Sequence, residues 1–148
     1  MRESPDNYDA ELLLRLYELR REERLRRARD WMMREFQADT AEDLVRKYPP
    51  GSEEDAFFRM DVSYWEMVAS LVNHGLLKEE LVFENTMELW ATWEKVKTLV
   101  PSLREARKNP LSWKNLETLA HKYEQWMATR APEALDNFRQ RLKAATKK

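Results

Sequence analysis

Glycine is nearly absent from this chain, because Gly51 and Gly75 are the only two among 148 residues. Phosphate-cradling loops and dinucleotide-binding turns use several glycines, since the backbone there must approach the ligand closely. Cysteine is absent altogether, which excludes disulfides, thiolate metal sites and cysteine nucleophiles. The sequence therefore predicts that any function is built on regular secondary structure, and it implies no cofactor.

The segments between the prolines are rich in Leu, Glu, Arg, Lys, Met and Ala, and no apolar alternation of period two is sustained. Such segments favour helices over strands. A hydrophobic content of 43% is enough for one core. We therefore expect an all-α fold, a single-domain helical bundle of about six to seven helices over residues 1–148, with frayed ends at 1–8 and 144–148.

Caps and breaks divide the chain. The first helix is expected to be long, from about Asp6 to Ala38. Later helices are expected from Thr40 to Tyr48, from Ser52 to Gly75, from Lys78 to Val100, from Pro101 to Lys108, from Asn109 or Ser112 to Arg130, and from Pro132 onward.

The helix expected from Ser52 to Gly75 is apolar apart from one narrow polar stripe, which predicts a central helix buried by several neighbours. Asp61 falls opposite that stripe, and a buried carboxylate must find partners or take up a proton. Lys97, on the apolar face of the following helix, is a candidate partner. A structural carboxylate is the favoured interpretation, and an acid that grips a ligand is the alternative.

Six tryptophans are spread over four of the expected helices: Trp31, Trp65, Trp90, Trp93, Trp113 and Trp126. Their helical spacing indicates core positions. The alternative is a small-molecule pocket lined by aromatic rings, formed around Asp61, Trp65, Trp90 and Lys97.

The first half of the long helix carries a second apolar line, formed by Leu12, Leu16 and Leu19. An apolar line that the bundle leaves uncovered is an interface for a partner protein or a second copy. The competing interpretation is that the last helix, through Leu135, Phe138 and Leu142, folds over it. The arginines that follow are interleaved with glutamates and the net charge is −1, so nucleic acid is not an expected partner.

Residues for catalysis are scarce. The two histidines are His74, expected to cap a helix C-terminus, and His121, which forms with Glu117 only two ligands of a metal site. No nucleophile motif accompanies either histidine. The sequence therefore assigns no catalytic, cofactor-binding or metal residue and argues against an enzyme. No apolar stretch is long enough for a membrane span and the N-terminal segment is polar, which predicts a cytoplasmic protein.

Three stretches carry a family resemblance. They are residues 28–31 (ARDW), residues 64–77 with YWEMVA and NHGLL, and residues 89–101, from Leu-Trp to Val-Pro. On these stretches the chain resembles a bacterial family of small, Trp-rich helical proteins known only as a domain of unknown function. The resemblance covers roughly Ala10 to Met127. The resemblance implies an all-helical fold and a bacterial source, and it brings no catalytic residue, cofactor or substrate. The residues themselves favour a non-enzymatic protein that acts as a homodimer or accessory subunit through its first helix, with small-ligand binding as the alternative.

Overall fold

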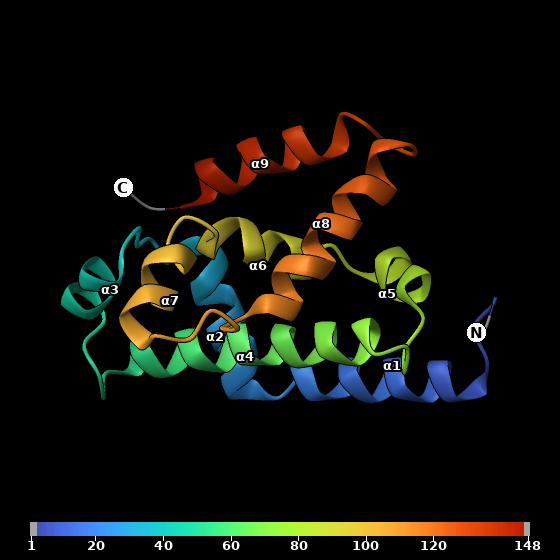
Figure 1. The fold of residues 1–148 in the computed structure, drawn as a ribbon, viewed down its shortest axis with the longest axis horizontal. Coiled ribbons are helices and arrows are strands. Elements are labelled where there is room, and N and C mark those ends of the chain that lie inside the picture. Colours follow the sequence, from blue (N-terminus) through green and yellow to red (C-terminus); the bar gives the residue numbers. More distant parts are fainter. Residues whose placement is uncertain (1–2, 147–148) are drawn as a thin grey trace.

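The computed structural model describes residues 3–146, and these form nine α-helices and no strand (Figure 1). The helices are α1 (Asn7–Arg20), α2 (Glu23–Arg34), α3 (Ala41–Lys47), α4 (Glu53–Asn73), α5 (Glu79–Asn85), α6 (Glu88–Val96), α7 (Val100–Arg107), α8 (Lys114–Ala128) and α9 (Ala134–Ala145). The predicted all-α class is confirmed, whereas the predicted count of six to seven helices is too low. Of the ends expected to fray, residues 1–2 and 147–148 lie outside the described residues.

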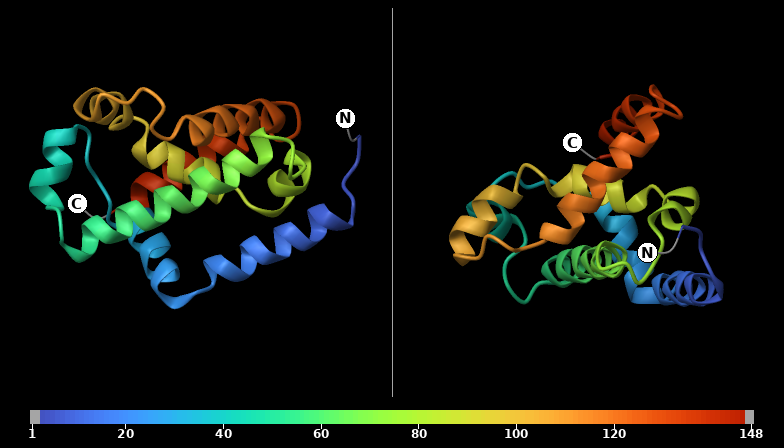
Figure 2. Two further views of the ribbon diagram at one scale, coloured as in Figure 1. Left: turned by 60° about the horizontal axis from the view of Figure 1, so that its bottom comes forward. Right: turned by 45° about the vertical axis from the view of Figure 1, so that its right-hand side comes forward.

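In place of the single long helix expected from about Asp6 to Ala38, the chain forms two helices and changes direction between them (Figure 2). Glu22 leaves the helical conformation with φ −58° and ψ 142°, and its carboxylate accepts the Leu25 N–H at 3.0 Å. Glu22 thus caps the N-terminus of α2. Nη1 of Arg29 donates to the Arg20 carbonyl at 3.1 Å, which satisfies a backbone oxygen left open where α1 ends.

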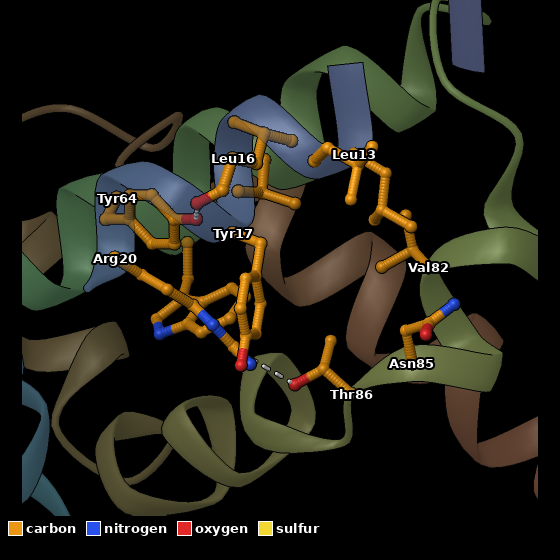
Figure 3. Close-up of a pocket in the computed structure, with 11 residues that line it drawn as sticks. Leu13, Leu16, Tyr17, Arg20, Tyr64, Val82, Asn85 and Thr86 are labelled. Carbon is orange, nitrogen blue, oxygen red and sulfur yellow. Dashed lines mark hydrogen bonds between the residues drawn. The ribbon is translucent and has the colours of Figure 1, made fainter. Parts of the chain in front are cut away.

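The helix expected from Lys78 to Val100 is also divided. Thr86 is extended, and its Oγ1 accepts the Glu88 N–H at 3.0 Å. That bond satisfies a free donor at the start of α6, as capping hydroxyls do. The break matters for the site described below, because it places Asn85, the last residue of α5, and Thr86, in the turn that follows, beside the cavity next to α1 (Figure 3).

Helix α4 is the longest helix and the centre of the core. It packs closely against α2 and α8 and also contacts α6. Its buried residues include Phe57, Phe58, Val62, Trp65 and Val68. The expectation that Asp61 is buried is confirmed, because its exposed fraction is 0%.

Five of the six tryptophans are core residues with exposed fractions of 8% or less, and Trp126 is partly buried against the same core. One aromatic group joins α2, α3 and α4 through contacts of Trp31 with Phe36, Tyr48 and Phe57. A second joins α5, α6, α8 and α9 through Phe83, Trp90, Tyr123 and Phe138. The interpretation of the tryptophans as packing residues is therefore confirmed.

Helix α9 packs on α2 and α8 and lies on the side of the molecule opposite α1 (Figures 1 and 2). It therefore does not cover the apolar line of α1, as one interpretation of the sequence had it. Within residues 3–146, no helix has the length and apolar character needed to cross a membrane.

Candidate functional site

A cavity of about 470 Å³ lies between α1, α4 and α5 (Figure 3). Cavities of roughly 300–1,000 Å³ are typical of small-molecule sites. Its lining comes from all three helices and the turn after α5: Leu13, Leu14, Leu16, Tyr17, Arg20, Tyr64, Trp65, Val68, Val82, Asn85 and Thr86.

The cavity exists because α1 is held to the bundle at a few points and is not packed closely along its length. Near its start, Asp9 is 0% exposed, and its Oδ1 accepts the Lys78 N–H at 2.9 Å. Near its middle, the Tyr64 hydroxyl donates to the Leu16 carbonyl oxygen. Arg29 holds the last carbonyl of α1, as described above. These contacts fix α1 at a distance from α4 that side chains on the two helices do not fill.

The inner wall of the cavity is apolar. Leu16, Trp65, Val68 and Val82 are each 5% exposed or less. The outer edge is also apolar but open to solvent, because Leu14 is 67% exposed and Tyr17 is 51% exposed. An apolar molecule that entered from this edge would be removed from water on several sides.

Arg20 provides the cationic group of the cavity, and its side chain is only 16% exposed. Nη1 lies 3.4 Å from Thr86 Oγ1 and 3.9 Å from Glu88 Oε1, and the guanidinium carbon lies 4.8 Å from the centre of the Tyr17 ring. These polar contacts are long for hydrogen bonds. The five N–H donors of an arginine therefore exceed what Thr86 and Glu88 take up, and donors remain for an anionic group.

Beside Arg20 lies a charge network in which Asp61 is buried and Arg29 and Glu88 are partly buried. Arg29 makes two hydrogen bonds with Glu88, of 2.9 and 2.8 Å. Burial raises the pKa of Asp61 well above its usual value, and the negative charge of Glu88 raises it further, while Arg29 and the Trp65 indole oppose the shift. Neither oxygen of Asp61 has a hydrogen-bond partner of acceptable geometry among residues 3–146. Burial also raises the pKa of Tyr64, to about 12.

A family profile described as a domain of unknown function, DUF4760, matches residues 7–126. The chain belongs to the DUF4760 family. The DUF4760 region includes every residue that lines the cavity, and it ends within α8, before α9 begins. No curated protein and no solved structure shows significant similarity to the chain.

The structure does not bring together the four residues of the expected aromatic pocket. Trp65 lines the cavity, and Asp61 lies one turn earlier on α4 without lining it. Trp90 is on α6, where its Nε1 donates to Glu124 at 3.0 Å. Lys97 is exposed and its Nζ lies 3.0 Å from Glu94, so the expected pair with Asp61 is not formed.

The three leucines of the expected interaction line differ in exposure. Leu16 is 5% exposed and belongs to the core, and Leu12 is partly buried against it. Leu19 is 46% exposed. The more exposed apolar side chains of α1 are Leu14, Tyr17 and, near the N-terminus, Tyr8.

Two further residues singled out in the sequence have structural contacts. His74 ends α4, and its Nδ1 lies 2.9 Å from the Ser70 carbonyl oxygen, as expected of a helix cap. Glu117 is bonded to Arg104 at 2.9 Å, and a group of three or more potential metal ligands does not occur in residues 3–146.

Sequence reasoning did not identify Asp9, Arg20, Asn85 or Thr86 as site residues. The signal for the last two was local, because Asn and Thr are adjacent residues of low helix propensity inside an expected helix. Asp9 and Arg20 gave no such signal, because their importance depends on contacts with α5 and α6 that are remote in sequence.

Proposed function

We propose that this DUF4760 protein binds a small amphipathic molecule in the cavity between α1, α4 and α5. The observation that carries the proposal is the position of Arg20, a largely buried cation in a cavity that is otherwise lined mainly by apolar side chains. The favoured ligand has an apolar body and one anionic group.

The two parts of such a ligand would make different contacts. Its apolar body would lie against Leu16, Val68 and Val82, where each buried methylene contributes about 0.8 kcal/mol. Its anionic group would approach the Arg20 guanidinium, whose attraction for an anion is stronger there than at an exposed arginine because the surroundings are less polar. The side chains of Asn85 and Thr86 supply further polar atoms in the same cavity (Figure 3).

Octanoate and 1-octanol are suitable probes, since they share an apolar chain and differ in charge. We expect both to raise the melting temperature and octanoate to do so at lower concentration, because only octanoate has a carboxylate for Arg20. A ligand at 100 times its dissociation constant adds about 2.7 kcal/mol to the free energy of unfolding. Differential scanning fluorimetry checks the shift, and isothermal titration calorimetry gives the affinities.

Matched variants locate the binding site. Leu13→Trp fills the cavity from the α1 side and should abolish the response to both probes. Leu111→Trp places the same side chain at an exposed position, 70% exposed in the wild type, outside the cavity, and should leave the response unchanged. Arg20→Met should remove the advantage of octanoate over 1-octanol. Equal responses in wild type, Leu13→Trp and Leu111→Trp would contradict the proposal.

A second candidate function is self-association through α1. It is supported by the exposure of Leu14 and Tyr17, which are 67% and 51% exposed, lie three residues apart on one side of α1 and form the outer edge of the cavity. Apolar side chains concentrated on one surface are typical of protein interfaces. A second copy docked there would cover the open edge of the cavity, with Leu12 and Leu16 supporting the interface from within.

Size-exclusion chromatography with light scattering tests this candidate. We expect a dimer that Leu14→Glu combined with Tyr17→Glu converts to a monomer, because two buried charges would be unpaired. Leu76→Glu, at an exposed leucine of the α4–α5 turn, is the matched control and should remain dimeric. A wild-type monomer at all concentrations would rule the dimer out.

A further inference from the structure

A second cavity, of about 610 Å³, lies between the C-terminal end of α6, α9 and the segment that follows α2. Lys95 lines this cavity. Four further charged residues of the lining come from the three surrounding segments: Asp39, Lys97, Arg139 and Lys143. Glu94 also lines the cavity, but it is bonded to Lys97 at 3.0 Å and to Arg139 at 2.9 Å. The cavity is separate from the one beside α1 and shares no lining residue with it.

Among the lysines of residues 3–146, Lys95 is distinguished by its burial and by its hydrogen bond. Its Nζ donates to Thr146 Oγ1 at 2.8 Å, and no carboxylate within residues 3–146 forms an ion pair with it. Burial lowers the pKa of Lys95 to about 8. In roughly a fifth of the molecules the Lys95 amine is then neutral at pH 7.4, compared with about one in a thousand for an ordinary lysine. A partly buried lysine in this state is a nucleophile.

From this geometry we propose that Lys95 is a covalent binding site for a small aldehyde or ketone that carries an anionic group. The carbonyl carbon would approach Nζ, and the anionic group would lie beside the cationic side chains of the same cavity. Lys97 and Arg139 already form ion pairs with Glu94. Lys143 forms no such ion pair within residues 3–146 and is therefore the cation most available to the anionic group.

The reaction is imine formation, which needs no oxidant or reductant. The lone pair of the neutral Lys95 Nζ forms a bond to the carbonyl carbon, and the carbonyl π electrons move to the oxygen. A proton passes from nitrogen to oxygen through solvent to give the carbinolamine. The oxygen then leaves as water with a second proton, and the C=N bond forms. One amine and one carbonyl compound thus yield one imine and one water.

Reductive trapping tests the proposal on the full chain. The protein is incubated at pH 7.4 with 4-formylbenzoate and cyanoborohydride, and peptide mass spectrometry measures the labelling rate of each lysine. We expect Lys95 to be labelled about tenfold faster than Lys97 or Lys143. The labelling rate of Lys95 should rise with pH and level off above pH 8, whereas the rate of exposed lysines should continue to rise above pH 9. The neutral aldehyde 4-formylbenzamide should label Lys95 more slowly than 4-formylbenzoate.

Lys95→Arg should remove the fast-labelled site without changing the circular dichroism spectrum. In the wild type, denaturant should remove the preference for labelling at Lys95. Lys143→Gln should reduce the advantage of the anionic aldehyde while leaving Lys95 as the labelled residue. Labelling of Lys95 no faster than that of Lys97, or equal rates with the two aldehydes, would overturn the proposal.

Discussion

The two halves of the segment expected to form one helix behave differently in the structure. Helix α2 packs closely on α4 and buries Leu25, Ala28, Trp31 and Met32. Helix α1 is longer by two residues but buries only Asp9 and Leu16. Helix α2 is therefore part of the core, whereas α1 is an attached helix that leaves room for a cavity.

Substitutions in the two helices should differ strongly in their cost to the free energy of unfolding. Met32→Ala in α2 should lower the free energy of unfolding by about 2–5 kcal/mol, because Met32 is 0% exposed and its removal leaves a void. Leu14→Ala in α1 should change it by less than about 0.5 kcal/mol, because Leu14 is 67% exposed. Urea unfolding of both variants measures the difference, and similar losses would contradict the comparison.

The next effect concerns ion pairs made by α2. Arg29→Gln should cost about 2–3 kcal/mol, because it leaves Glu88 without its main partner in a site where both side chains are about one-fifth exposed. Arg27→Gln is the matched control, since Arg27 and Glu53 are each 50% exposed, and such pairs contribute about 0–1 kcal/mol. Urea unfolding in low salt measures both, and an equal loss for the two variants would show that burial of the Arg29 pair is unimportant.

A smaller and more local effect is expected at the start of α1. Asp9→Ala removes the acceptor of the Asp6 and Lys78 N–H groups, and leaving such donors unsatisfied costs about 1–3 kcal/mol. Because Asp9 joins α1 to the start of α5, we expect faster hydrogen exchange in α1 with little change in α2. Exchange that accelerates equally in both helices would mean that they open together.

A dependence on pH is expected from Asp61, because its burial, together with the negative charge of Glu88, raises its pKa against the opposing effect of Arg29. Because the pKa of Asp61 is raised in the folded state, the folded protein binds the proton more tightly than the unfolded chain. The contribution of Asp61 to stability is therefore greatest below pH 4 and is lost as pH rises toward the folded pKa. Asp61→Asn should match the wild type near pH 4 and be the more stable protein at pH 7.

Urea unfolding of Asp61→Asn and wild type across this pH range checks the sign. A wild type that gains stability relative to Asp61→Asn as pH rises would show that Asp61 is charged and paired in the folded protein. On an Arg29→Gln background the loss of stability relative to Asp61→Asn should continue to higher pH, since Arg29 favours the charged form of Asp61 and its removal raises the folded pKa further.

Periodicity and capping signals predicted much of the fold. The narrow polar stripe of α4 correctly predicted a central helix and a buried Asp61, and helical spacing correctly placed five tryptophans in the core. The predicted caps at Thr40 and Ser52 are formed, and of the two candidates for the first cap, Asp6 and Asn7, Asp6 forms it. These features depend on residues within one or two turns of each other, which is the range over which a sequence pattern is informative.

The two helix breaks and the cavity were not predictable in the same way. Glu22 stands in a run of good helix formers, and its role as a cap depends on α1 and α2 taking different directions. Arg20 becomes a cavity residue only because Thr86 and Glu88, more than sixty positions away, lie beside it. Helix propensity contains no information about such contacts. Residues differ in helix propensity by only a few tenths of a kcal/mol, and tertiary contacts easily override differences of that size.

Local patterns in the sequence specify an all-helical chain with a tryptophan-rich core, and the scarcity of glycine excludes glycine-rich binding loops. Packing between helices sets which apolar face of the first helix is buried, where that helix ends, and which charged side chains are removed from water. The physical reason is that helix formation depends on local spacing, whereas cavities and the burial of charge depend on how helices distant in sequence pack against each other.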